Sequence, residues 1–581
     1  MNTRNSYLIS HAFRNYLWAS LLSSLSLQMA VTTDAVVVGR YIGADALSAI
    51  NLLMPVTTLV AALSSLIGLG PAILASKAIG NRKCEKVNMV FTSAVLQAII
   101  IGCLEGMCIH AFSPEIASLL CHDGHILPYL MEYLEVVPWG FGLTILVFSL
   151  VSLVEADGHP KLAAKALAVG CLANVLLDVL WVGYGGMGVR GAAWAMVVNN
   201  LLVIGFFALR LKCEGVSYRW LWPRKNIVNV TLAGLKEGMF MMLNDLLYSL
   251  MLFLLNSLMF SVCGGQGLFF WSICVQLLLL VIMVVDGGEG AVLSIGSMLM
   301  GEDDRTGFRM LVRRLIRMIV VIVAGIVLLV WLFPETVMRI FGEDTGALPE
   351  WSLAVRVFSL MLLPYAVSMF MRSFFQAMDY KLLGMAFSLV QFVGMIVCLW
   401  MAARWLPQAV WWSFPVSAFL VLTVQLACLL FLRRKKWATD IFLHSSDKDR
   451  KFIDLSIEYS VEPVMESIGQ VCTFLDRHKV NRMTVMSVNI CCEELMLNIV
   501  RYQSHKHNPY MDLHIAVTGQ KVSFVLKDAG RPFNPVLLSQ ENRPEVGDDS
   551  HLGLMMVNSV CTTLTHKYMY GQNIVFAEFG S

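Results

Sequence analysis

Apolar segments of about 20 residues, separated by short polar ones, recur along the chain from Leu17 to Leu432. A helix of about that length crosses the hydrocarbon core of a bilayer, so the pattern predicts about twelve transmembrane helices. The polar segments between them are 80–86, 113–125, 158–165, 220–226, 301–309, 341–350 and 379–382. We expect this part of the chain to be all-α and embedded in a membrane.

The pattern changes after Leu432. From Asp447 onward charged residues are frequent, and no stretch is apolar for long enough to span a bilayer. This tail of about 135 residues is long enough for one domain with its own core. The predicted elements are a strand at 452–460, helices at 461–479 and 483–502, strands at 510–519 and 521–528 joined as a hairpin, a helix at 552–561 and final strands. They predict an α/β sandwich.

Composition supports the membrane assignment. The chain is 57% hydrophobic and 14% charged, with a mean hydropathy of +0.68, whereas charged residues make up roughly a quarter of a soluble protein. The net charge of +2 gives no reason to expect a nucleic-acid partner. The 14 cysteines lack the spacing of a metal site or of a secreted disulfide framework, so we expect no cysteine ligand and no disulfide.

Basic residues predict the orientation, because Lys and Arg favour cytoplasmic loops. They gather in alternate loops, at 77–86, 161–165, 210–236, 305–317 and 433–436, while the intervening loops are acidic or poor in such residues. Both termini are therefore expected in the cytoplasm, with an even number of helices in the cell (inner/cytoplasmic) membrane. The first residues lack a cleavable signal peptide, so the first helix is expected to remain.

An internal repeat runs through the membrane part at an offset of about 221 residues. Gly80 aligns with Gly301, and Phe112 in FSPEIASLL aligns with Phe333 in FPETVMRIF. EADGHPKLAA aligns with QAMDYKLLGM at nearly the same offset. The repeat predicts two six-helix lobes, and we place the domains at 1–222, 223–437 and 445–581.

Ionisable residues inside apolar helices are costly and mark candidate sites. Asp34 lies well within the first helix and Asp178 within the fifth, where Asn174, four residues earlier, shares its face. Such a carboxylate has to pair, bind a cation or take up a proton. The alternative for Asp34 is a structural one, in which it only bonds the neighbouring hydroxyls of Thr32 and Thr33.

Three further carboxylates, Asp245, Asp286 and Glu289, are also candidates in the membrane part. Each of them could instead lie near a helix end in contact with water. The sequence alone leaves these two interpretations open.

Several separated motifs in this part occur in the order found in one transporter family. They are DAVVVGRYIGADALSAINLLMPV, SSLIGLGPAILASKAIGNRKCEKVN, EADGHPKLAAKALAVGCLANVLLDVLW and GGMGVRGAAWAMVVNN. Over about residues 10–435 the chain resembles the multidrug and toxin extrusion (MATE) family. The resemblance implies alternating access between two lobes and export of organic cations or drugs, driven by inward H⁺ or Na⁺, with Asp34, Asn174 and Asp178 at the cation site. Many relatives have Thr at the position of Met196, and losing that oxygen favours protons over sodium.

The soluble part has a candidate nucleotide site. Glu494 and Asn498 lie one helical turn apart, so the Asn oxygen could bind a magnesium ion while the Glu orients water or a hydroxyl. Taken alone, the pair is better explained as a solvated helix face, because helices carry such pairs constantly. Asp528 and Gly530 follow a predicted strand, and Gly553 opens a helix whose amides favour phosphate.

This order of motifs resembles the GHKL ATP-binding fold over about residues 450–580, and in plan the bacterial anti-sigma-factor serine kinases. The resemblance implies ATP and Mg²⁺ as cofactors, with Asn498 on the metal, Glu494 as the catalytic base or water-orienting group, Asp528 on adenine, and Gly530 and Gly553 lining the pocket. The sequence departs from the pattern at His551, where relatives have glycine, and Gly547 is the only other glycine of the lid. No phosphoacceptor histidine hairpin precedes the domain, which disfavours a sensor histidine kinase.

We therefore expect a cation-coupled drug exporter with a cytoplasmic ATP-binding domain that is regulatory or acts as a serine kinase. Without a GxxxxGK[ST] loop, ATP is not expected to power transport directly. One alternative is a membrane-anchored, partner-switching serine/threonine kinase that uses the membrane part as a sensor, with a small Ser/Thr-phosphorylated protein as partner. Another is a flippase for lipid-linked substrates. The sequence does not identify the exported compound.

Overall fold

The computed structural model describes residues 7–81, 84–121, 125–210, 218–221, 227–302, 304–341, 348–378, 380–434, 438–440, 443–444, 451–503, 510–536 and 549–580. The chain divides into two compact units. The larger unit comprises Leu17–Asp303 and Val312–Leu430, and the smaller comprises Met1–Tyr16, Asp304–Leu311 and Phe431–Ser581. We describe each unit separately.

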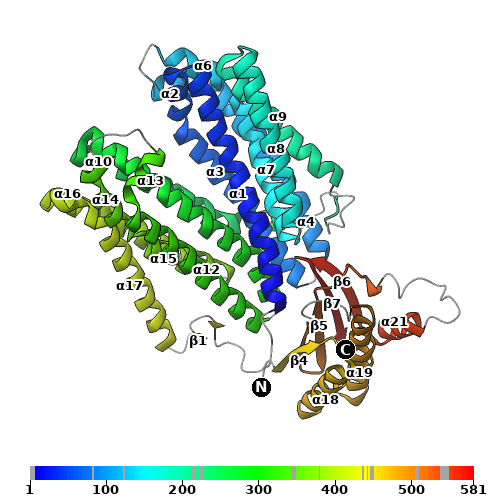
Figure 1. Cartoon of the computed structure of the whole chain (residues 1–581). Helices are drawn as coiled ribbons and strands as arrows, with labels where there is room; N and C mark the ends of the chain where they lie inside the picture. The colour runs from blue at the N-terminus through cyan, green and yellow to red at the C-terminus, as the bar shows by residue number, and fades with distance from the viewer. Residues whose placement is uncertain are drawn as a thin grey trace. The chain divides into compact units, whose positions relative to one another are not determined.

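The first half of the larger unit is entirely helical (Figure 1). Its long helices are α1 (Tyr7–Tyr41), α3 (Met54–Gly80), α4 (Cys84–Ala111), α7 (Val137–Ala156), α8 (Pro160–Asp178) and α9 (Gly188–Arg210). The short helices α2 (Ala44–Leu52), α5 (Ser113–Leu120) and α6 (Leu127–Leu134) connect them, and a π-helical turn, Val179–Tyr184, extends α8. A common apolar core joins these helices, so the half forms one lobe.

The second half repeats this architecture. Its helices are α10 (Ile227–Ala291), α11 (Ser297–Gly301), α12 (Arg305–Leu332), α13 (Pro334–Phe341), α14 (Leu348–Ser359), α15 (Leu362–Ala377), α16 (Lys381–Trp405) and α17 (Ser413–Arg434). A π-helical turn, Val292–Gly296, joins α10 to α11, and a 3₁₀ turn, Pro407–Trp412, precedes α17.

Helix α10 contains two membrane spans. Its 65 residues would extend for about 98 Å if straight, far beyond the hydrocarbon core of about 30 Å. The indole of Trp271 donates a hydrogen bond to Asn256, although the two residues are 15 positions apart. In a straight helix they would be about 22 Å apart. The helical chain therefore folds back on itself between these two residues.

The prediction of about twelve membrane helices is confirmed. Among the described residues, twelve helices are long and apolar enough to cross a membrane, judged by length and composition. One of them, Arg482–Tyr502, belongs to α19 (Arg482–Gln503) of the smaller unit and contributes side chains to that unit's core. The other eleven lie between Met54 and Phe431. The 35-residue helix α1 precedes them and completes two lobes of six spans.

Glycines allow two helix pairs to approach closely. A Cβ at Gly102 of α4 would lie 2.4 Å from the carbonyl oxygen of Gly142 in α7. A Cβ at Gly70 of α3 would lie 2.3 Å from the carbonyl oxygen of Gly234 in α10. Small residues at such crossings let backbones pack directly against each other in a membrane. The second contact joins the two lobes.

The smaller unit contains a five-stranded antiparallel sheet with the order β3-β4-β5-β7-β6. The strands are β3 (Lys451–Glu458), β4 (Tyr510–Thr518), β5 (Lys521–Asp528), β6 (Thr563–Met569) and β7 (Gln572–Phe579). Three helices, α18 (Val461–Arg477), α19 and α21 (Asp549–Val560), cover one face of the sheet (Figure 1). A separate two-stranded pair, β1 (Ala438–Asp440) and β2 (Leu443–His444), precedes it. The predicted α/β sandwich is confirmed, and α21 begins at Asp549, three residues before the predicted start.

The core of the sandwich follows from alternation along the strands, because successive side chains point to opposite faces. On β5, Phe524 and Leu526 pack with the helices. They meet Val488 and Met496 of α19 and Val557 of α21, all of which are buried. The last residue of β5 on this same face is Asp528, so the sheet presents a carboxylate where the apolar core ends.

Candidate functional sites

The first candidate site lies in the N-terminal lobe, where one amide joins two carboxylates. Asn174 Nδ2 donates hydrogen bonds to Asp34 Oδ1 at 3.0 Å and to Asp178 Oδ2 at 2.9 Å. Asn174 and Asp178 are fully buried, whereas Asp34 is partly buried. The sequence analysis named these three residues, and the fold brings together α1 and α8, which carry them.

Asp178 Oδ1 is buried and has no hydrogen-bond partner among the described residues. A buried carboxylate oxygen without a donor is costly, because it loses its contacts with water and gains none. A bound proton or cation would remove that cost. This orphaned oxygen therefore fits a coupling ion at the site.

The local alternative for Asp34 can be examined at Thr33 only, since the side chain of Thr32 lies outside the described residues. The hydrogen bond recorded for the Asp34 side chain leads to Asn174 on another helix and not to a neighbouring hydroxyl. Tyr133 of α6 is buried close enough to interact electrostatically with both Asp34 and Asp178. Sequence reasoning missed Tyr133, because no local pattern connects it to carboxylates on α1 and α8.

The Met196 position lies in the same lobe and supplies no oxygen. A Cβ at Gly140 of α7 would lie 3.2 Å from the Met196 sulfur, so the thioether packs against that helix. The neighbouring amide of Asn200 donates to the Gly140 carbonyl at 3.0 Å and to Thr144 Oγ1 at 2.9 Å.

The second candidate site is a charged cluster in the C-terminal lobe. Arg372 Nη2 of α15 lies 3.3 Å from Glu289 Oε2 of α10. Asp245 and Asp286, also on α10, are close enough to interact electrostatically with the same guanidinium. Glu289 is buried, whereas Asp286 is exposed. The cluster combines three carboxyl groups with one guanidinium.

The sequence analysis missed Arg372. It lies in the apolar segment SMFMRSFF, and a lone arginine in a membrane span is itself a signal of a paired or functional group. Its partner Glu289 is 83 residues away, so no local pattern connects the two residues.

The third candidate site lies on the helix-covered face of the sheet. Glu494 and Asn498 are one turn apart on α19, and Asn498 is 4% exposed. Its Nδ2 atom is buried with no hydrogen-bond partner among the described residues. A Cβ at Gly553 of α21 would lie 1.9 Å from Glu494 Oε2. The carboxylate therefore lies directly against the backbone of α21, and a side chain at position 553 would have to displace it.

Asp528 at the end of β5 is held rigidly. Its Oδ1 atom accepts hydrogen bonds from the Gly530 amide at 2.7 Å and from Asn573 Nδ2 at 3.1 Å. Asn573 lies directly opposite Asp528 in the β5–β7 register. It also binds the loop after β5, donating to the Arg531 carbonyl at 2.9 Å and accepting from the Phe533 amide at 3.0 Å. Asn573 is a site residue that the sequence analysis did not identify.

Two titrating side chains border this site. Burial raises the pKa of Tyr459, and the nearby Asp528 carboxylate raises it further. Burial lowers the pKa of His566, while its contact with Asn573 opposes that shift. His566 Nε2 lies 3.2 Å from Asn573 Oδ1, where the neutral ring can donate a hydrogen bond. Both groups are therefore favoured in their uncharged forms.

The arrangement fits a magnesium nucleotide on three counts. Asn498 offers a buried amide nitrogen with no hydrogen-bond partner among the described residues, Gly553 leaves no side chain in the second turn of α21, and the Asp528 carboxylate is fixed for a directed hydrogen bond. Residue Gly547 and the side chain of His551 lie outside the described residues. The predicted lid is therefore not tested by the structure.

Two family models match the chain. The model named MatE matches residues 19–180 and 241–401. The starts of these two matches are 222 residues apart and their ends are 221 residues apart, close to the offset of the predicted repeat. The model described as histidine kinase-like ATPase domain matches residues 460–577.

Known proteins match the membrane part. The multidrug export protein MepA of Staphylococcus haemolyticus is 24% identical over 151 residues, which cover 26% of this chain and a third (33%) of MepA's length. An outward-facing multidrug resistance MATE family transporter of the MOP superfamily is 19% identical, with a TM-score of 0.67 over 75% of this chain and 98% of that one. The Vibrio cholerae MATE transporter VcmN, in a mutant form, has a TM-score of 0.68 at 19% identity over 74% of this chain and 98% of its own. A MOP superfamily transporter from Pyrococcus furiosus has a TM-score of 0.66 at 18% identity, over 73% of this chain and 95% of its own. At these identities the structural matches establish the fold.

Proposed function

Because the chain belongs to the MatE family, whose model matches more than half of its residues, we propose that it is a proton-coupled exporter of organic cations or drugs. Its histidine kinase-like ATPase domain binds a magnesium nucleotide and regulates the transporter. The observation that carries the transport proposal is the buried Asp34–Asn174–Asp178 group with its orphaned Asp178 oxygen.

The coupling reaction starts from two carboxyl groups that share one amide donor. Because the interior of a lobe has a low dielectric constant, two unscreened negative charges at this distance strongly destabilise each other. One proton on the pair removes that repulsion and gives the orphaned Asp178 oxygen a hydrogen. Protonation then changes how α1 packs on α8, because Asp34 and Asp178 lie on different helices. This change of packing is the step that releases the drug.

Asn174 favours a proton over sodium as the coupling ion. Its nitrogen donates to both carboxylates, so its amide oxygen is directed away from the space between them. Sodium prefers several oxygen ligands, and Met196 offers sulfur packed against Gly140 instead of a hydroxyl. A proton needs only one carboxylate oxygen.

The C-terminal lobe supports an organic cation as the exported compound. Asp245, Asp286 and Glu289 outnumber the single guanidinium of Arg372 with which they interact. A cation that enters this cluster gains a carboxylate partner, whereas an anion would face the net negative charge. The exposed Asp286 is the carboxylate most accessible to such a ligand.

The nucleotide proposal rests on residues of α19, α21 and β5. Asn498 would hold the magnesium ion and Asp528 would accept a hydrogen bond from the adenine amino group. The bound nucleotide would supply a phosphoryl group, and its magnesium ion would supply positive charge beside that group. Glu494 would orient a water molecule or a hydroxyl group beside the second turn of α21, where Gly553 gives it room.

The position of Glu494 also favours a second candidate function, a serine kinase acting on a small partner protein. A carboxylate held in the nucleotide site can accept the proton of an incoming hydroxyl group. In that case the membrane part would act as the sensor. Export that persists in an Asn498→Ala variant would favour the transporter.

The basic loops favour an orientation in the cytoplasmic membrane with both termini inside. The nucleotide site then faces the cytoplasm, where ATP is available. Membrane lipid surrounds the twelve spans.

Export of a fluorescent organic cation by inverted membrane vesicles tests the transport proposal. With an imposed pH gradient and no sodium, wild-type protein is expected to accumulate the dye, and Asp34→Asn is expected to lose coupled uptake by about tenfold or more. The matched control is Asp45→Asn, which changes an exposed carboxylate on α2 and should leave uptake unchanged. Uptake at the wild-type rate by Asp34→Asn would refute the assignment.

A further inference from the structure

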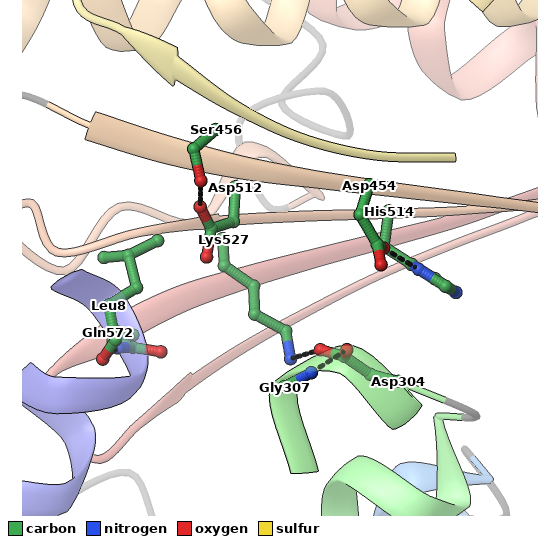
Figure 2. A network of polar contacts seen from close by, with 9 residues as sticks. All are labelled: Leu8, Asp304, Gly307, Asp454, Ser456, Asp512, His514, Lys527 and Gln572. Atoms are coloured by element: carbon green, nitrogen blue, oxygen red, sulfur yellow. Dashed lines mark hydrogen bonds and ion pairs between the residues drawn. The ribbon is translucent and has the colours of Figure 1, made fainter. Parts of the chain in front are cut away.

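The sheet of the ATPase-like domain has a second face, opposite its helices. Six polar residues of this face form a cluster: Asp454 and Ser456 of β3, Asp512 and His514 of β4, Lys527 of β5, and Gln572 of β7 (Figure 2). Except for Ser456, all of them are at most 5% exposed. A sheet face that is open to water keeps its polar side chains exposed. The part of the second face that carries this cluster is therefore covered.

Cross-strand pairs organise the polar residues on this face. His514 Nδ1 lies 2.6 Å from Asp454 Oδ1, and the two residues are directly opposite in the β3–β4 register. Ser456 donates a hydrogen bond to Asp512, and Asp512 lies opposite Lys527 on β5. These cross-strand pairs fix the position of the Lys527 side chain on the sheet.

One segment that covers the second face is the beginning of α12, within Asp304–Leu311 of the same compact unit. Lys527 Nζ lies 3.8 Å from Asp304 Oδ2, and Asp304 is 1% exposed (Figure 2). The other oxygen of Asp304, Oδ1, accepts a hydrogen bond from the Gly307 amide at 2.8 Å. Asp304 therefore caps the amino end of α12 and pairs with the sheet at the same time.

The other segment is the beginning of α1, within Met1–Tyr16 of the same unit. Gln572 Nε2 donates a hydrogen bond to the Leu8 carbonyl, and Asn15 Nδ2 donates to the Tyr570 carbonyl at 3.2 Å. The rings of Tyr16 and Tyr570 are 6.0 Å apart.

The turn between β6 and β7 fits this helix closely. Gly571 has a φ of +79°, and a Cβ there would lie 2.6 Å from Asn15 Nδ2. Glycine allows both the positive φ and the close approach.

The docking residues adjoin the candidate nucleotide site along the strands. Lys527 immediately precedes Asp528, and Gln572 immediately precedes Asn573. Asp528 and Asn573 are register partners joined by a hydrogen bond on the helix-covered face. A shift of either strand at the nucleotide site therefore moves a docking residue on the opposite face.

We propose that the second face of the sheet is a docking surface for the amino ends of α1 and α12, and that it links nucleotide occupancy to the transport cycle. The linkage rests on the proposed nucleotide site, and α1 is the helix that carries Asp34. If the nucleotide changes how tightly the sheet holds α1, the coupling ion has to change nucleotide affinity in the same ratio, because linkage is reciprocal.

Lysine labelling of the full-length protein in lipid nanodiscs tests the docking. The protein is treated with an amine-reactive reagent, and mass spectrometry measures the labelling rate of Lys527. The reference is the labelling rate of Lys521, an exposed lysine on the same strand. In the wild type we expect Lys527 to react at least about tenfold more slowly than Lys521, because reaction requires undocking. Asp304→Asn should bring the two rates together.

A second variant separates undocking from the loss of the α12 cap. Gln572→Glu replaces the donor to the Leu8 carbonyl with an acceptor and leaves Asp304 intact. It should also raise the rate at Lys527 while the rate at Lys521 stays unchanged. Equal rates for the two lysines in the wild type, or an unchanged Lys527 rate in both variants, would overturn the docking.

The linkage is tested by repeating the labelling with saturating Mg-ATP. The Lys527 rate should change at least about twofold in the wild type and not at all in Asn498→Ala. An unchanged rate in protein that binds ATP overturns the linkage alone. Failure of the wild type to bind ATP overturns the nucleotide site and the linkage together, whereas the docking is still decided by labelling without nucleotide.

Discussion

At the residue scale, single amides organise both halves of the chain. Asn174 donates to Asp34 and Asp178 in the membrane lobe, and Asn573 binds Asp528 and the following loop in the sheet domain. Asn174 joins the carboxylates of two helices, and Asn573 joins one carboxylate to the loop that follows its strand. The chemistry of each site therefore depends on a neutral amide side chain that does not change its own protonation state.

Asn498 is the residue whose loss should most directly remove nucleotide binding. Asn498→Ala deletes a buried amide whose nitrogen has no hydrogen-bond partner among the described residues and whose oxygen is the proposed magnesium ligand. We expect Mg-ATP affinity, measured by calorimetry on the full-length protein, to fall by at least about tenfold, since one lost ligand to a charged group costs about 1.5–3 kcal/mol. The control Asn558→Ala, at an exposed position on α21, should bind normally. Equal affinity in the two variants would rule out Asn498 as a ligand.

His566 gives the sheet domain a predictable response to pH. Burial lowers its pKa below the ordinary value of 6.5, so as pH falls below 6.5 the unfolded chain takes up the proton before the folded domain does. The stabilisation by the neutral ring is complete above 6.5 and is lost as pH falls toward the lowered pKa. Thermal unfolding at about pH 7.5 and about pH 5.5 should show a smaller acid-induced drop in Tm for His566→Gln than for the wild type. The same drop in both proteins would contradict this.

At the element scale, α19 shows where sequence reasoning succeeds and where it fails. Its composition qualifies it as a membrane span, yet its apolar side chains pack in the core of the sandwich. The spacing of Glu494 and Asn498 along α19 is local, and it was predictable from helical periodicity. The contact of Glu494 with Gly553 was not, because it joins two helices 59 positions apart in the sequence.

The same distinction applies in the membrane part. The pair Asn174 and Asp178 follows from a spacing of four residues, whereas the bond from Asn174 to Asp34 joins positions 140 residues apart. Arg372 was missed for the same reason, since its partner Glu289 lies on another helix. Local patterns predict which residues share a face, and tertiary packing decides which faces meet.

The contact between α19 and α21 leads to a paired prediction for two helical glycines. Gly553→Ala would place a methyl group 1.9 Å from Glu494 Oε2 and force that carboxylate to move. Gly469→Ala on α18 meets no atom within 4 Å and should stabilise the domain by about 0.5–1 kcal/mol. Chemical denaturation should therefore show opposite signs for the two variants, with weaker ATP binding only for Gly553→Ala. Stabilisation by both substitutions would show that Glu494 does not lie against α21.

At the scale of the whole molecule, the chain joins a duplicated transporter body to an ATP-binding fold. The MatE model matches both lobes, and the ATPase model matches the tail. The two lobes do not carry equivalent sites. The N-terminal lobe holds a small buried carboxylate pair suited to a proton, and the C-terminal lobe holds a larger charged cluster with an exposed carboxylate suited to a cationic ligand.

The measurement that tests the central claim most directly is proton release on binding of an organic cation to the purified protein, in a weakly buffered, sodium-free solution. If drug and proton oppose each other through Asp34 and Asp178, wild-type protein should release about one proton per bound cation. Asp34→Asn should bind the cation and release none, and Asp45→Asn should behave as the wild type. Binding by the wild type without proton release, or equal release by Asp34→Asn, would contradict proton coupling at this site.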